Sequence, residues 1–263
     1  MGCILPIIRF VNPEPAFFFA AGLFAIGWVQ ILRIRTASRG TMVAQQGLLG
    51  NLVAGLRYVY TQPLMRALML VTVCHCALTM AYESAFPLVA RTQLGLRDAK
   101  GLFAGPAYLM IGLGAGAVLG NVVLARVGEQ QRRGKLFFGV GVLSGLTPIL
   151  LGSTPSLPVA MLAAAAVGAS TSAFMTFSQG IVQALAPDGM RGRVMSAHTW
   201  HTQGAMGGFN AVNGLLMDVP WMTVPLLFGG TGMLFAVLML GSLLLVPLRT
   251  LYARGLPTDA LTH

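Results

Sequence analysis

Four polar residues at helical spacing are the side chains in this sequence best placed to do chemistry. Thr72, His75, Thr79 and Glu83 are separated by three, four and four positions, so on one continuous helix they share a face. Histidine titrates near neutral pH, and a carboxyl group can also exchange a proton. The pattern predicts a proton or substrate pathway. The alternatives are a buried, hydrogen-bonded His75 and a locally paired Glu83.

A second polar group combines hydroxyls and amides with aromatic rings. Thr176 and Gln179 lie beside Phe174 and Phe177, and could line a cavity for an amphipathic organic solute. The alternative is that they only join helices by hydrogen bonds, as such side chains often do in membranes. Further along the chain are other polar residues of the same kind: His198, Thr199, His201, Gln203, Asn210 and Asn213.

Catalytic and metal-binding patterns are weak. Cys74 and Cys76 flank His75, but helix residues two positions apart point in different directions. His198 and His201 lack the spacing of a zinc protease motif, and no Gly-rich phosphate loop ends in Lys-Ser or Lys-Thr. The sequence therefore predicts no catalytic residue, no metal, no cofactor and no ATP coupling by this chain, so it is not expected to be an enzyme.

The elements that must position these residues are long apolar runs. Of 263 residues, 56% are hydrophobic and 9% are charged, whereas a soluble domain has about a quarter charged residues. Runs of about 20 apolar residues are typical of membrane-spanning helices. The prediction is an all-α, polytopic membrane protein with about seven spans: 16–32, 67–90, 102–125, 136–151, 157–185, 194–217 and 224–245.

The cations predict how the chain is oriented. If the spans alternate, most of the 17 Lys and Arg residues fall on one side: Arg33, Arg35, Arg39, Arg57, Arg66, Arg126, Arg132, Arg133, Lys135, Arg191, Arg193, Arg249 and Arg254. The other side receives Arg9, Arg91, Arg97 and Lys100. The positive-inside rule then places the first set, and the C-terminus, in the cytoplasm of a multi-pass cell-membrane protein. The sequence has no basic stripe interleaved with aromatic residues, so nucleic-acid binding is not expected.

The stretch APDGMRGRVMSA, residues 186–197, concentrates charge between two apolar runs. Pro187 cannot continue the preceding helix. Asp188 is expected to cap the next helix, and Arg191 and Arg193 suit anionic lipid headgroups. These features predict a cytoplasmic turn.

Three segments resemble the major facilitator superfamily of transporters. The motif PDxxRGRVMS, residues 187–196, resembles the cytoplasmic loop between the tenth and eleventh helices, most closely in the branch of enterobactin-type siderophore exporters and transmembrane secretion effectors. Residues 125–128 with Arg132 and Arg133 resemble the Asp-Arg-x-Gly signature, although Ala125 replaces its aspartate. The segment LRYVYTQPLMRALML, residues 56–70, resembles the basic amphipathic approach to the seventh helix.

The resemblance implies that the chain supplies helices six to twelve. Residues 1–35 would be part of an N-terminal half, residues 36–66 a cytoplasmic linker, residues 67–248 a six-helix C-terminal half, and residues 249–263 a cytoplasmic tail. The implied function is proton-coupled export of a small organic molecule such as a drug or siderophore, together with a missing N-terminal half or a second copy. The implied cytoplasmic gate comprises Asp188, Arg191, Arg193 and Arg126. The alternative is a non-transporting membrane scaffold or an inactive truncated remnant.

Glycines in the third apolar run predict close helix packing. Gly112, Gly116 and Gly120 recur every four residues and so present one bare helix face. Small residues at this spacing let helices approach closely in lipid. The face could serve plain packing, a sliding surface for alternating access, or both.

Overall fold

The structure is a computed structural model that describes residues 13–33, 47–96, 99–126 and 133–256. These residues are helical with short turns and no strand, so the all-α prediction is confirmed. The chain divides into two compact units, Met1–Met42 and Val43–His263. In the first unit the described residues form the 20-residue helix α2, Pro13–Leu32, which covers the first predicted run.

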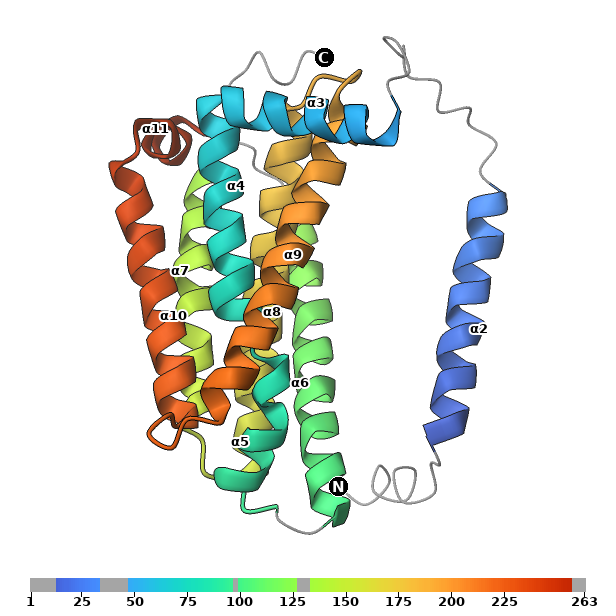
Figure 1. The fold of residues 1–263 in the computed structure, drawn as a ribbon, viewed down its shortest axis with the longest axis vertical. Helices are drawn as coiled ribbons and strands as arrows, with labels where there is room; N and C mark the ends of the chain where they lie inside the picture. Colours follow the sequence, from blue (N-terminus) through green and yellow to red (C-terminus); the bar gives the residue numbers. More distant parts are fainter. Residues whose placement is uncertain (1–12, 34–46, 97–98, 127–132, 257–263) are drawn as a thin grey trace. The chain divides into compact units, whose positions relative to one another are not determined.

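The second unit is a helix bundle (Figure 1). Its long helices run roughly along one direction, whereas α3 and α11 lie across the same end of the bundle. The bounds of these helices are α3 Leu48–Thr61, α4 Pro63–His75, α5 Phe86–Thr92, α6 Ala99–Ala125, α7 Arg133–Gly152, α8 Leu157–Leu185, α9 Arg191–Met217, α10 Val224–Gly241 and α11 Val246–Arg254.

Five segments of the described residues are long and apolar enough to cross a membrane: Pro63–Thr92, Ala104–Ala125, Gly134–Gly152, Leu157–Leu185 and Val224–Leu244. The protein is therefore a multi-pass membrane protein. The sixth predicted span is α9, which has 27 residues but carries too many polar side chains to belong to this group. Polar residues at membrane depth usually face the interior of a bundle or a water-filled cavity.

The second predicted span is not one continuous helix. After α4 the chain forms a π-helical segment, Cys76–Met80, and then a 3-10 turn, Glu83–Ala85, before α5 begins. Pro87 lies in the first turn of α5 and has no N–H to give to the preceding turn, which favours a break at this point. The side-chain amide of Asn213 on α9 donates a hydrogen bond to the carbonyl of Ala81 at the break.

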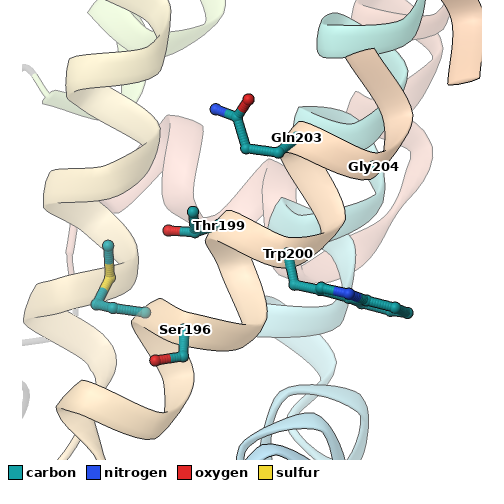
Figure 2. Close-up of a pocket in the computed structure, with 6 residues that line it drawn as sticks. Ser196, Thr199, Trp200, Gln203 and Gly204 are labelled. Atoms are coloured by element: carbon teal, nitrogen blue, oxygen red, sulfur yellow. The ribbon is translucent and has the colours of Figure 1, made fainter. Parts of the chain in front are cut away.

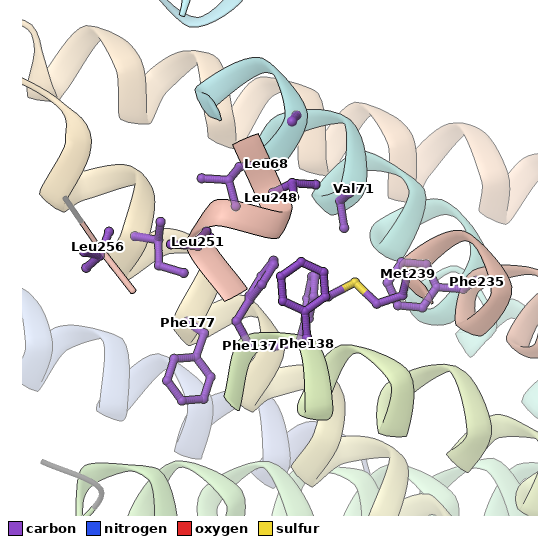
Figure 3. Packing of buried hydrophobic residues seen from close by; sticks show 13 residues of the cluster. Leu68, Val71, Phe137, Phe138, Phe177, Phe235, Met239, Leu248, Leu251 and Leu256 are labelled. Atoms are coloured by element: carbon purple, nitrogen blue, oxygen red, sulfur yellow. The ribbon is translucent and has the colours of Figure 1, made fainter. Parts of the chain in front are cut away.

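The end of the bundle that carries α3 and α11 has an aromatic and aliphatic core (Figure 3). Leu68 and Val71 of α4 and Phe137 of α7 belong to it, together with Leu248 and Leu251 of α11. Close van der Waals packing of such side chains holds the helices together at this end of the bundle. Residues 249–254 of the predicted tail belong to α11, a short helix that begins at Val246 and packs on the bundle.

Candidate functional site

His75 lies inside the bundle rather than on a cavity wall. Its side chain is fully buried. The imidazole stacks on the ring of Phe174 with centroids 4.1 Å apart and meets the ring of Phe235 edge-on at 5.1 Å. Neither ring nitrogen has a hydrogen-bond partner among the described residues. In this conformation the histidine is enclosed by aromatic rings and reaches no solvent.

The two threonines of the predicted stripe are also buried, and their hydroxyls have partners. The Thr72 hydroxyl lies 2.6 Å from the Ser178 hydroxyl of α8, and it donates to the Leu68 carbonyl at 2.8 Å. The Thr79 hydroxyl donates to the His75 carbonyl at 2.8 Å. In this structure Thr72 joins α4 to α8, and Thr79 bonds to the last residue of α4.

The predicted four-residue face is wrong at Glu83. The change to π-helical geometry and the turn at Ala81 and Tyr82 interrupt the helical repeat between Thr79 and Glu83. As a result Glu83 is exposed in the 3-10 turn, whereas the other three members of the stripe are buried. Within the described part of the chain, no three His, Cys, Asp or Glu side chains gather closely enough to hold a metal ion.

Thr176 and Gln179 lie on the exposed side of α8. The Thr176 hydroxyl donates to the Asn121 side-chain oxygen of α6 at 2.8 Å, so this residue links two helices. Gln179 lies about 9 Å along the axis from the end of α8, at 1.5 Å per residue. Its exposed amide is unsuited to contact with lipid tails, because an unpaired polar group costs several kcal/mol there.

The exposed side of α9 carries a hollow of about 670 Å³. Figure 2 shows Ser196, Thr199 and Gln203 along one side of the helix and Trp200 projecting from the other. Among the described residues, those that line the hollow come from α9: Met195, Ser196, Thr199, Trp200, Gln203 and Gly204. Thr199 and Gln203 were among the polar residues noted in the sequence, but the hollow was not predicted. The sequence pattern that could have indicated the hollow is a set of polar, small or aromatic residues spaced three and four positions apart.

The predicted gate motif forms a compact turn between α8 and α9. A guanidinium nitrogen of Arg191 lies 2.8 Å from a carboxylate oxygen of Asp188. The Nε of Arg191 donates to the Gln183 carbonyl at 3.3 Å. In a continuing helix that carbonyl would accept from residue 187, but Pro187 has no N–H. Arg191 therefore supplies a donor that Pro187 cannot.

The prediction that Asp188 caps α9 is wrong. The N-cap residue is Met190, and no side chain caps it. The turn places Asp188 outside the helix, where its carboxylate pairs with Arg191 instead. Arg193 contacts the Met190 sulfur at 3.7 Å. Within the described residues, Arg126 is exposed and forms no ion pair with Asp188.

The glycine face predicted in the third run lies against α8. A Cβ atom on Gly112 would come within 2.5 Å of the Met161 carbonyl oxygen, and one on Gly120 within 2.6 Å of the Ala169 carbonyl oxygen. A Cβ on Gly116 would overlap the Ala165 carbonyl. The two backbones therefore approach more closely than any side chain on this face would allow.

Comparisons with known proteins place the chain in a family. The family model described as transmembrane secretion effector matches residues 2–255. A curated relative, "Multidrug efflux pump Tap" of Mycolicibacterium fortuitum, is 25% identical over 184 residues, which cover 66% of this chain and 42% of the relative. The chain thus matches less than half the length of that relative. No solved structure matches it. Because the family match covers nearly the whole chain, the protein belongs to the transmembrane secretion effectors of the major facilitator superfamily of transporters.

Proposed function

We propose that this chain forms one wall of a secondary exporter that moves a small organic molecule out of the cell, driven by the proton gradient. The protein would lie in the cell membrane with its C-terminus in the cytoplasm. A first transporter half, or a second copy of this chain, would supply the opposite wall.

The observation that carries the proposal is the exposed polar surface of α8 and α9. Gln179 of α8 and Thr199 and Gln203 of α9 are all exposed. Gln203 lies about 18 Å along the axis from the start of α9, at 1.5 Å per residue, close to the middle of a bilayer. Amides at that depth face a water-filled path or another protein rather than lipid tails. A transport path beside this surface would provide the water, and the opposite wall of that path would provide the other protein surface.

Secondary transporters place their substrate and ion sites near the midplane, between two sets of helices. Family membership and the likeness to a protein named as a multidrug efflux pump favour export and an organic substrate. His75 is the proposed proton carrier, because its ring nitrogens have no partner in this conformation and are free to bond elsewhere in another. Glu83, exposed at the break in the second span, is the second candidate.

The turn formed by Asp188 and Arg191 is the proposed cytoplasmic gate. Exposed ion pairs contribute less than about 1 kcal/mol, so the local pair is too weak to hold a transporter closed. A gate here requires additional contacts from this turn to the opposite wall, present in the outward-open state and absent in the inward-open one. Arg126, exposed at the end of α6, is proposed to take part in those contacts.

The test is export from energised cells that express this chain with a complementary first half, and from cells that express it alone. The expected result is efflux of a fluorescent dye by the pair, which stops when an uncoupler collapses the proton gradient. Efflux that continues without the gradient would contradict proton coupling. Absence of efflux from the pair, with both parts present in the membrane, would favour the alternative of a non-transporting scaffold.

A further inference from the structure

Trp200 offers the largest exposed aromatic surface in the hollow on α9. Its side chain is 62% exposed and lines the hollow with Met195, Ser196, Thr199, Gln203 and Gly204. An indole ring presents a broad flat face on which another planar ring can stack. A stacking site also needs a ring that is held in one orientation, because a mobile ring loses rotational freedom when it binds.

The Trp200 ring is held by the next residue. His201 meets it edge-on, with ring centroids 5.5 Å apart and an interplanar angle of 89°. Edge-to-face pairs of this kind are a favoured geometry for aromatic rings. The imidazole therefore packs against the indole and limits its rotation.

The His201 ring is in turn fixed at both nitrogens. Nδ1 lies 2.8 Å from the Ala197 carbonyl oxygen, which can only accept, so Nδ1 carries the proton. In neutral imidazole, Nε2 then has a lone pair, and the Tyr60 hydroxyl donates to it at 2.9 Å. Tyr60 thereby anchors the ring that supports Trp200.

Tyr60 reaches α9 from α3, a helix 141 residues away in sequence. The two helices also touch closely at the first turn of α9, where a Cβ on Gly55 would overlap the Arg193 carbonyl. Val59, next to Tyr60, is fully buried. The position of Tyr60 is therefore set by the packing of α3 on the start of α9.

From this series of contacts we infer that Tyr60, acting through His201, is a positioning residue for Trp200, and that the hollow on α9 is a stacking site for planar aromatic solutes. The inference rests on the proposed function and gives it a substrate class. The other lining groups are two hydroxyls, one amide and one thioether, without a charged side chain. They suit a planar molecule that is neutral or carries a delocalised positive charge, which an indole face also attracts.

The test uses the full chain in detergent and ethidium, a planar aromatic cation, as the probe. With Trp28→Phe and Trp221→Phe, Trp200 is the only tryptophan that remains, and ethidium should quench its fluorescence in a saturable way. Tetraethylammonium, a cation without a ring, should not displace ethidium. Trp200→Leu leaves no tryptophan in this background, so its ethidium binding is followed by the fluorescence of ethidium itself. This binding should be weakened roughly tenfold, the size expected for one stacking contact.

Tyr60→Phe keeps the ring and removes only the hydroxyl donor. It should weaken ethidium binding about threefold and lower the fluorescence anisotropy of Trp200 before any ethidium is added. The second readout separates positioning from a general structural effect. Tyr58→Phe on the same helix is the matched control: burial raises the pKa of the Tyr58 phenol, so this change removes no charge, and both values should match the parent.

If Trp200→Leu leaves the affinity for ethidium unchanged, the stacking site is overturned. Parental affinity and parental anisotropy in Tyr60→Phe would overturn the positioning role. Both measurements are independent of transport, so a protein that binds ethidium at Trp200 but exports nothing contradicts the proposed function alone. Export that is unchanged by Trp200→Leu, together with unchanged ethidium affinity, contradicts this inference alone.

Discussion

Arg191 holds Asp188 and the end of α8 at the same time. One of its nitrogens lies 2.8 Å from the Asp188 carboxylate, while another donates to the Gln183 carbonyl at 3.3 Å. The planar guanidinium presents its donors in a fixed fork, so one side chain can serve two acceptors in different directions. This arrangement depends on the shape of the side chain as well as on its charge.

The first prediction is therefore that Arg191→Lys impairs export by the assembled transporter. A lysine keeps the charge but cannot satisfy both acceptors with the same geometry. Asp188→Asn should impair export in the same direction, because it removes the charge of the partner. Since the pair is exposed, each change should alter stability by less than about 1 kcal/mol. Initial dye-efflux rates, normalised to protein in the membrane, provide the measurement.

Normal export by both Arg191→Lys and Asp188→Asn would show that positive charge alone is sufficient at this turn. Arg249→Lys serves as the control, because Arg249 is an exposed arginine on α11 at the same end of the bundle. Export by the Arg249→Lys variant should equal export by the parent.

The second prediction concerns the contact between α6 and α8. Gly116→Leu places a side chain where the Ala165 carbonyl lies, so the helices must separate. Overpacking of this kind costs about 1–3 kcal/mol. The melting temperature in detergent should fall clearly. It is measured from the fraction of protein that stays monodisperse after heating.

Gly114→Leu is the matched control on the same helix, since a Cβ on Gly114 meets no atom within 4 Å. It introduces the same residue with the same helix propensity. Equal melting temperatures for the two variants would contradict the close contact between the two backbones.

The comparison of these glycines shows what sequence periodicity can predict. A spacing of four places Gly112, Gly116 and Gly120 on one face, and the structure places that face against α8. The seven apolar runs likewise indicated where helices form, because length and hydrophobicity are local properties. Both features are determined within a single segment of the chain.

Features that depend on the pairing of distant segments were not predicted. The contact of Tyr60 with His201 joins residues 141 positions apart, and no local pattern indicates it. The break before Glu83 was also missed, because a single proline inside an apolar run is compatible with a continuous span, since neighbouring groups can satisfy the freed backbone. As a consequence a stripe that is regular in sequence has three buried members and one exposed member.

The third prediction concerns orientation in the membrane. The positive-inside rule places Arg57 and Arg191 in the cytoplasm, together with Arg132, and places Arg97 outside. Arg132 and Arg97 lie outside the described residues. With the native cysteines replaced, Arg97→Cys should react with a membrane-impermeant thiol reagent in intact cells. Arg57→Cys, Arg132→Cys and Arg191→Cys should react only after the cells are opened.

Labelling of Arg191→Cys in intact cells, without labelling of Arg97→Cys, would show that the orientation is the reverse of the predicted one. A variant that carries no cysteine gives the background in both conditions. Reaction of every variant after permeabilisation shows that each thiol is accessible when the reagent can reach it.

The fourth prediction is that His75→Phe separates stability from proton coupling. His75 packs between Phe174 and Phe235, and both of its nitrogens are buried without a hydrogen-bond partner among the described residues. Replacing an unpaired buried polar group with an apolar one of similar shape is neutral or stabilising, by up to about 1–3 kcal/mol. The melting temperature should therefore stay the same or rise. Proton-driven export should be lost, because a phenyl ring cannot carry a proton.

His75→Gln tests the same role with a side chain that keeps hydrogen-bonding capacity but does not titrate near neutral pH. If His75 carries the proton, both variants lose proton-driven efflux while Glu83→Gln retains it. If both histidine variants export with parental proton dependence and Glu83→Gln does not, the exposed carboxyl group at the break of the second span is the carrier. The aromatic surroundings of His75 would then serve packing alone, since a ring that never leaves them has no route to water.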